Sequence, residues 1–134
     1  MTLGVLFTVA SCGSKTGEKD LEDVKARGTI IVGMECAYAP YNWAQATSNE
    51  YASVRLDNGT YADGYDVQMA KKIAEALGVE LVIKPIEWNG LTSALNSKQI
   101  DLIIAGMSPT EDRKLSIDFT DTYYDSDLVM VVRK

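Results

Sequence analysis

The sequence predicts an α/β fold in which a mostly parallel sheet is flanked by helices. Short runs of β-branched residues alternate along the chain with amphipathic segments of helical period, and two of those segments end at a glycine. This alternation is typical of parallel α/β layers, because parallel strands need a connecting helix between them. The chain has 134 residues, of which 46% are hydrophobic, so one domain with a buried core is expected.

The first elements after the N-terminal segment are a short helix and a strand. A helix is expected over residues 21–27 (LEDVKAR), with Asp20 as its N-cap and Gly28 at its end. Residues 29–34 (TIIVGM) are rich in β-branched side chains, which predicts a buried strand.

The middle of the chain is predicted to contain turns and then a helix. Residues 35–63 are rich in Tyr, Asn, Ser and Gly, and the sequence around residues 57–59 (DNG) favours a short hairpin. Residues 65–77 place apolar side chains on one helical face, and Gly78 follows as a stop signal.

The last third continues the alternation of strands and helices. Strands are expected at residues 79–85, 100–105 and 127–133, where apolar side chains are concentrated. A helix is expected at residues 88–96, and a shorter one at residues 110–114.

The N-terminal segment is interpreted as a lipoprotein leader. Residues 1–12 end in VASC, which resembles a bacterial lipobox with Cys12 as the lipidated residue. Residues 13–20 (GSKTGEKD) have the composition of a polar tether. The apolar run is short and no Lys or Arg precedes it, so the leader is expected to start further upstream. The alternative is a short apolar strand with an ordinary cysteine.

Composition excludes several function classes. A net charge of −6 argues against nucleic-acid binding, which needs clustered Lys and Arg. The chain has no histidine, which removes the commonest general base and metal ligand and disfavours catalysis. The two cysteines form no CxxC pair, so neither a zinc site nor another metal site is expected, and no cofactor is expected.

Residues that follow the strand at 100–105 have the chemistry of a carboxylate site. Ligands of parallel sheets bind beyond the carboxyl ends of the strands. Gly106 allows close approach to the backbone, Ser108 offers a hydroxyl near a helix start, and Arg113 has a planar fork that fits a carboxylate. The alternative is an ordinary helix cap, with Arg113 paired to Glu111 or Asp118 on the surface.

Aromatic side chains near the same strand ends divide into three groups. Tyr38 and Tyr65 are interpreted as flat faces against a ligand side chain, and Trp88 as a packing residue. For Tyr41 and Trp43, the sequence does not decide between ligand contact and packing. For each single aromatic residue, packing at a strand–helix junction is the alternative.

Glu35 and Cys36 come directly after the strand at residues 29–34. The carboxylate of Glu35 is placed to meet a ligand cation, and the alternative is a solvated loop charge. Cys36 is interpreted as a small apolar residue that fills space in the core.

Four ordered phrases connect these features to a known family. IIVGMECAYAPYNW, DGYDVQMAKKIAEALG, WNGLTSALNSKQIDLIIAGMSPTEDR and IDFTDTYY span about residues 29–132. In this order they resemble the solute-binding proteins of polar amino-acid ABC importers. The resemblance implies a lobe of the periplasmic-binding-protein type II class over residues 21–134, a free amino acid as ligand and ABC permease subunits as partners. It also implies a location at the cell surface or in the periplasm.

The resemblance assigns roles to individual residues. It implies that the Tyr38 and Tyr65 rings flank the ligand and that Arg113 holds its α-carboxylate, with Glu35 near the ligand side chain. Backbone and hydroxyl groups of the turn before Arg113 add hydrogen bonds. The candidate ligand-binding residues are Glu35, Tyr38, Trp43, Tyr65, Ala105, Gly106, Ser108 and Arg113.

Three departures from the family pattern affect these expectations. Glu35 replaces the usual aspartate, which leaves the preference for cationic ligands open, and Ala105 stands where some members carry serine. The sequence ends at Lys134, about where the family's chain crosses into a second lobe, so half of the pocket is expected here. Two other functions stay open: a cyclohexadienyl or arogenate dehydratase on the same scaffold, and the sensor domain of a fused receptor.

Overall fold

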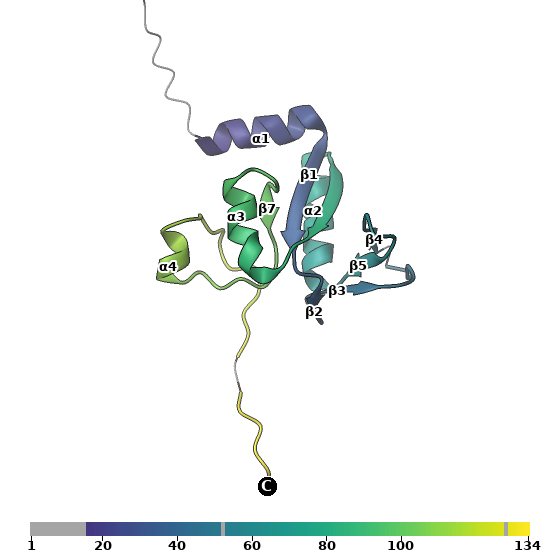
Figure 1. Cartoon of the computed structure of the whole chain (residues 1–134), viewed down its shortest axis with the longest axis vertical. Coiled ribbons are helices and arrows are strands. Elements are labelled where there is room, and N and C mark those ends of the chain that lie inside the picture. The colour runs from purple at the N-terminus through teal and green to yellow at the C-terminus, as the bar shows by residue number, and fades with distance from the viewer. Residues whose placement is uncertain (1–15, 52, 128) are drawn as a thin grey trace, which may run out of the picture.

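The computed structural model describes residues 16–51, 53–127 and 129–134 (Figure 1). Cys12 and the apolar segment before it lie outside the described residues. In the described part of the chain, no helix has both the length and the apolar character needed to cross a membrane.

Among the described residues, three parallel strands form the central sheet, in the order β6-β1-β7. β1 (Thr29–Met34) lies in the middle and pairs with β6 (Glu80–Pro85) along its whole length. β7 (Leu102–Ile103) pairs with the second half of β1. The prediction of a parallel α/β sheet is confirmed, although β7 is shorter than the strand expected at residues 100–105.

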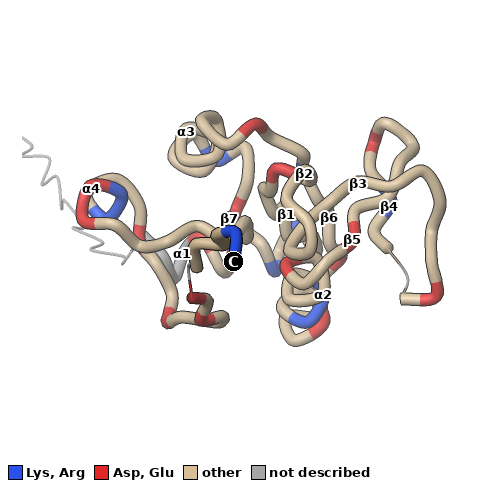
Figure 2. The backbone as a smooth tube through the Cα atoms, turned by 90° about the horizontal axis from the view of Figure 1, so that it is seen from below, with Lys and Arg blue, Asp and Glu red and all other residues tan. Residues whose placement is uncertain are grey.

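Helices cover both faces of this sheet. α2 (Tyr65–Leu77) and α3 (Leu91–Asn96) lie on opposite faces, and α1 (Thr16–Arg27) crosses the amino ends of the strands (Figures 1 and 2). The apolar face of each helix packs on the sheet, so the core lies between the layers. The largest fully buried apolar side chains are Val32, Met34, Val67, Leu91 and Ile100.

The start of α1 differs from the sequence prediction. Asp20 lies inside the helix and not at its N-cap, and its carboxylate pairs with Lys98 Nζ at 2.8 Å. The helix extends back to Thr16 through residues that include Glu and Lys, both of which have high helix propensity. Its end is as predicted, because the N–H of Gly28 bonds the Val24 carbonyl at 3.0 Å.

A second, small sheet occupies the region that was predicted to contain turns. It is antiparallel, with the strand order β2-β3-β5-β4. The predicted hairpin is confirmed between β4 and β5, where the N–H of Leu56 donates to the carbonyl of Thr60 at 2.8 Å. The four strands are β2 (Ala37–Tyr38), β3 (Asn42–Gln45), β4 (Val54–Arg55) and β5 (Tyr61–Asp63).

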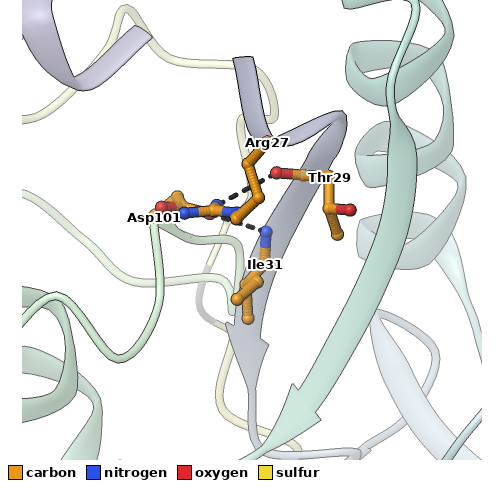
Figure 3. A network of polar contacts seen from close by, with 4 residues as sticks. All are labelled: Arg27, Thr29, Ile31 and Asp101. Atoms are coloured by element: carbon orange, nitrogen blue, oxygen red, sulfur yellow. Dashed lines mark hydrogen bonds and ion pairs between the residues drawn. The ribbon is translucent and has the colours of Figure 1, made fainter. Parts of the chain in front are cut away.

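The side chain of Asp101 connects the amino-terminal parts of the strands through polar contacts (Figure 3). Its Oδ2 accepts a hydrogen bond from the N–H of Ile31 at 2.8 Å and forms an ion pair with Arg27. The Arg27 guanidinium also donates to the carbonyl of Thr29 at 3.0 Å. The single acidic residue before β7 therefore ties α1, β1 and β7 together.

The C-terminal third differs most from the predictions. The helix expected at residues 88–96 is divided into a 3-10 turn, η1 (Trp88–Gly90), and α3. The short helix expected at residues 110–114 is present as α4 (Glu111–Lys114), with Thr110 as its N-cap. The strand predicted at residues 127–133 is wrong, because the described residues of that segment have no partner strand and are exposed. Apolar β-branched residues favour a strand only where a neighbouring strand and a core cover them.

Candidate functional site

The carboxyl ends of β1 and β7 face the same side of the molecule, where β2 and the chain leaving β7 also lie (Figure 1). Glu35 and β2 follow β1, and the segment from Ile104 to Arg113 follows β7. Tyr65, the first residue of α2, begins beside them, because its N–H donates to the Pro40 carbonyl at 3.2 Å. This arrangement confirms that the two predicted groups of residues come from neighbouring strand ends.

Tyrosine rings gather on this side of the sheet. The rings of Tyr38 and Tyr41 stack with centroids 5.1 Å apart, and Tyr65 stacks on Tyr123 at 6.2 Å. Tyr124 lies edge-on to both Tyr41 and Tyr65, at 5.4 Å from each. Tyr38 is 50% exposed and Tyr65 40% exposed, so both retain a solvent-facing surface inside this cluster.

Gly106 lies against the tyrosine cluster. Its backbone adopts a φ of 60°, which favours glycine, and a Cβ there would lie 3.4 Å from the Tyr38 ring. The N–H of Gly106 donates to the hydroxyl of Tyr123 at 3.3 Å. The backbone N–H of Gly106, which was expected to donate to a ligand, therefore donates to Tyr123 in this structure.

A chain of hydrogen bonds that is buried at Asn42 and Asp66 links the loop after β1 to Tyr123 through α2. Asn42 and Asp66 are both fully buried, and Asn42 Nδ2 donates to Asp66 Oδ2 at 2.8 Å. Asn42 Oδ1 accepts from the N–H of Cys36, and Asp66 Oδ1 accepts from the Tyr123 hydroxyl at 2.9 Å. We call Asn42, Asp66 and Tyr123 the polar relay. It joins the loop after β1 to the segment after β7.

Two groups at this relay have raised pKa values. Burial, followed by the charge of Asp66, raises the pKa of the Tyr123 phenol, so it stays protonated and donates to the carboxylate. Burial raises the pKa of the Cys36 thiol to about 11. The thiol is therefore neutral at physiological pH, as expected for a residue interpreted as an apolar filler.

The polar relay was not predicted from the sequence. Asp66 has the pattern of an ordinary acidic residue in the first turn of a helix, and Asn42 that of a turn residue. Tyr123 and Tyr124 were part of the phrase IDFTDTYY but carried no predicted role. Gly64, two residues before Asp66, was the one local feature of the sequence at this position. In the structure it has a φ of 122°, and a Cβ there would collide with the Tyr41 carbonyl.

Arg113 extends from α4 back toward the sheet. Its Nη1 donates to the carbonyl of Ser108 at 2.9 Å, and its Cζ lies 5.3 Å from the ring centroid of Trp88. Pairing with Glu111 or Asp118 was the alternative, but Glu111 pairs with Lys114 at 2.9 Å. Within the described residues, Arg113 forms no ion pair with a carboxylate.

The remaining candidate residues are Trp43, Glu35, Ala105 and Ser108. Trp43 belongs to the small sheet, where its Nε1 donates to Gln45 Oε1 at 3.1 Å and its ring packs at Gly64. Glu35 is half-buried at the end of β1, and Ala105 is buried so that only its backbone is available. Ser108 is exposed on the rim. The structure thus brings Tyr38, Tyr65 and Gly106 together through the tyrosine cluster, and Trp43 lies in the strand that pairs with β2.

A groove with a volume of about 940 Å³ runs along the β7 edge of the sheet, from the carboxyl ends of the strands to α1. Tyr38, Ala105, Gly106 and Ser108 line one end, and residues of α1 line the other. The segment around Tyr123 forms a further wall. The groove is therefore wider than the candidate site, and Glu35, Tyr65 and Arg113 do not line it.

The sequence from residue 30 to residue 134 matches the family described as bacterial extracellular solute-binding proteins, family 3. The chain belongs to this family. The family resemblance inferred from the four phrases is therefore confirmed, and its members are extracellular proteins by description.

Relatives within the family are amino-acid-binding proteins. The arginine-binding extracellular protein ArtP of Bacillus subtilis is 30% identical over 97% of this chain and 44% of its own length. The L-cystine-binding protein TcyJ of Escherichia coli is 35% identical over 85% of this chain and 38% of its own length. The chain therefore spans less than half the length of these curated relatives.

Solved structures of the family share the fold. Domain 1 of the arginine-binding protein TmArgBP from T. maritima, in its arginine-bound form, is 38% identical with a TM-score of 0.65 and covers 77% of this chain and 72% of that one. The ancestral amino acid-binding protein AncCDT-1, described as a precursor of cyclohexadienyl dehydratase, is 32% identical with a TM-score of 0.65 and covers 78% of this chain and 41% of that one. The predicted periplasmic-binding-protein type II lobe is confirmed.

Proposed function

We propose that this chain binds a free polar or basic amino acid and serves as the binding subunit of an ABC importer. Arg113 holds the α-carboxylate of the ligand in this proposal, and the rings of Tyr38 and Tyr65 flank its aliphatic part. Binding involves no covalent change. Specificity comes from the groups that meet the ligand side chain, among which Glu35, directly after β1, is the acidic candidate.

The observation that carries the proposal is the state of the Arg113 guanidinium. It is held by Ser108 and Trp88, yet no carboxylate of the described residues pairs with it. Arginine keeps its charge at all physiological pH values and binds a carboxylate through two parallel hydrogen bonds. The four-residue α4 is too short to add much helix dipole, so the guanidinium itself supplies the attraction.

Glu35 and the relatives favour a basic ligand within the proposed class. ArtP is named for arginine, and domain 1 of TmArgBP was solved in an arginine-bound form. A carboxylate at the end of β1 is placed to attract a guanidinium or ammonium group. Because TcyJ is named as a cystine-binding protein, the test also includes other polar amino acids.

The proposal includes a lipid anchor and a permease. Cys12 follows small residues in the manner of a lipobox, which would hold the protein at the membrane surface beside the permease that takes its cargo. Metabolic labelling of the full precursor with a radioactive fatty acid tests this part. Label that depends on Cys12 supports it, and a protein that remains unlabelled contradicts it.

Affinity is expected to be modest for a single lobe. A two-lobe member that binds near micromolar has a binding free energy of about −8 kcal/mol. A lobe that supplies half of the contacts retains about −4 kcal/mol, which corresponds to a millimolar dissociation constant. Sub-micromolar binding by this chain would contradict that estimate.

The test is a set of thermal melts of the 134-residue chain with each amino acid. At about 10 mM ligand, a millimolar binder stabilises the folded state by about 1.4 kcal/mol, which raises Tm by several degrees for a domain of this size. We expect one chemical class, with arginine among its members, to produce the shift.

A pair of variants on the same helix controls the test. Arg113→Ala should abolish the shift, whereas Lys114→Ala, which removes a neighbouring cation paired to Glu111, should preserve it. Equal shifts in both variants would show that Arg113 is not the carboxylate site. No shift with any amino acid, in this chain and in the full-length protein, would overturn the proposed function.

A dehydratase remains the second candidate because of the similarity to AncCDT-1. The absence of histidine from the sequence and the names of the relatives favour binding over catalysis. Incubation of the protein with arogenate and a chromatographic assay for the dehydrated product decides between the two.

A further inference from the structure

Tyr123 is held against the start of α2 by three contacts. Its hydroxyl donates to Asp66 Oδ1 at 2.9 Å, and its ring stacks on the ring of Tyr65 with centroids 6.2 Å apart. Its backbone carbonyl accepts a hydrogen bond from the Tyr65 hydroxyl at 3.3 Å. The first two residues of α2 therefore fix both the ring and the hydroxyl of a residue that is distant in sequence.

The hydroxyl of Tyr123 also accepts a hydrogen bond, from the N–H of Gly106 at 3.3 Å. A phenol has a single proton, and here that proton points to a carboxylate that is fully buried and also accepts from Asn42. The lone pairs of the oxygen are then left for the backbone donor. The direction of the bridge is thus defined: Gly106 donates to Tyr123, and Tyr123 donates to Asp66.

This bridge orients the peptide unit between Ala105 and Gly106. A peptide unit is planar and trans, so the N–H of Gly106 and the carbonyl of Ala105 point in opposite directions. Because the N–H is turned to Tyr123, the carbonyl is directed to the other side of the chain. Gly106 has a φ of 60° and no Cβ to restrict it, so an external contact limits its backbone more than that of another residue.

The carbonyl oxygens of Ala105 and Gly106 are acceptors that the lobe leaves available. In the described part of the chain neither oxygen accepts a hydrogen bond, and both residues line the groove. The carbonyl of Ser108, on the same segment, accepts from Arg113 at 2.9 Å. An amino acid whose carboxylate meets that guanidinium brings its ammonium group close to this segment, and carbonyl oxygens are suitable acceptors for an ammonium donor.

We propose that Tyr123 is a positioning residue for the ligand. It holds the Ala105–Gly106 peptide in the orientation that presents free carbonyl oxygens to the ammonium group, and it does not touch the ligand itself. Asp66 supports it by fixing the phenol proton. The inference rests on the proposed function in that it takes Arg113 as the carboxylate site.

Amide hydrogen exchange of the isotope-labelled chain tests the bridge without any ligand. In Tyr123→Phe the ring remains but the acceptor is lost, so the N–H of Gly106 should exchange about fivefold faster or more. The matched control is Arg27→Ala, which removes a polar contact at the opposite end of the sheet and should leave this amide unchanged. Exchange at Gly106 that is equal in Tyr123→Phe and the parent would overturn the proposal.

The consequence for binding is tested by NMR titration with two ligands. L-arginine has an α-ammonium group, whereas δ-guanidinovaleric acid keeps the carboxylate and the guanidinium but lacks that group. Tyr123→Phe should bind L-arginine about fivefold more weakly than the parent does and should bind the analogue within about twofold of the parent. Arg27→Ala should bind both ligands as the parent does. A general loosening of the lobe would instead weaken the binding of both ligands alike.

The outcomes separate this inference from the proposed function. A loss of affinity in Tyr123→Phe that is confined to L-arginine supports the positioning role. Parent-like binding of L-arginine by Tyr123→Phe, or an equal loss with both ligands, overturns the inference, and lost binding by Arg113→Ala in the same series keeps the proposed function. Unchanged binding of L-arginine by both variants would overturn the inference and the Arg113 assignment together.

Discussion

Arg27 and Arg113 lie at opposite ends of the central sheet, and their guanidinium groups have different partners. Arg27, at the amino end, pairs with Asp101 and donates to the Thr29 carbonyl, so its charge is neutralised inside the fold. Arg113, beyond the carboxyl end, is held by a carbonyl and an aromatic ring, neither of which neutralises it.

The difference separates a charge that the fold neutralises from one that stays available to a ligand. A fold gains modest stability from a partly exposed ion pair, and that pair leaves nothing for a ligand to bind. A guanidinium that is oriented but not neutralised keeps its capacity for a carboxylate. On this account, the guanidinium at the amino end of the sheet stabilises the fold, and the guanidinium at the carboxyl end is available to a ligand.

The largest expected effect comes from the polar relay, which is the structural element of the carboxyl end. Asp66→Ala should lower the free energy of unfolding by about 3 kcal/mol, because Asn42 and the Tyr123 hydroxyl lose their buried acceptor. Urea denaturation measures the loss, with Asp125→Ala at an exposed position as the control. A loss no larger than that of the control would show that the relay does not stabilise the rim.

Asp101→Ala tests the amino end and should cost about 2 kcal/mol. The N–H of Ile31 loses its side-chain acceptor and Arg27 loses its ion-pair partner. Arg27→Ala should cost about 1 kcal/mol or less, because that side chain is 43% exposed and solvent screens the pair. If Arg27→Ala proved as costly as Asp101→Ala, the ion pair and not the backbone hydrogen bond would hold the strands.

Tyr123→Phe should cost about 1 kcal/mol, because it removes one hydroxyl that bonds both Asp66 and Gly106 but keeps the ring. The amide of Gly106 should also exchange with solvent faster, which amide hydrogen exchange by NMR measures directly. Tyr51→Phe, at a residue 67% exposed, is the matched control and should change neither quantity. Unaltered exchange at Gly106 would contradict the bridging role of Tyr123.

The smallest expected effect is the pH dependence contributed by Cys36. Burial raises its pKa from 9.0 to about 11 in the folded state, so the unfolded chain releases the thiol proton first as pH rises. The stability linked to this thiol is fully present below pH 9 and is lost progressively between about pH 9 and 11. Comparing urea midpoints of the parent and Cys36→Ala across this window isolates the contribution, and parallel curves would exclude it.

Local sequence patterns were sufficient for the elements that carry their own signal. β1 and α2 were predicted with their observed bounds, because β-branched runs and a helical apolar face followed by glycine are local features. Arg113 became a candidate from the same kind of information, since its fork and the turn before it lie within a few residues of each other.

Contacts between distant residues could not be predicted in this way. The small sheet consists of strands of two to four residues whose pairing is set by tertiary contacts. Tyr123 meets Asp66 across 57 positions of sequence, and no local pattern in either segment signals the contact. The wrong strand at residues 127–133 has the same cause, because an apolar run does not specify which strand it will pair with.

The comparison of the two arginines is tested most directly by calorimetric titration of L-arginine into Arg27→Ala and Arg113→Ala, with urea denaturation of both. The account predicts that Arg113→Ala loses affinity by about tenfold or more with little change in stability, whereas Arg27→Ala keeps parent-like affinity and loses stability. Parent-like binding by Arg113→Ala, or an equal loss of affinity in both variants, would contradict it.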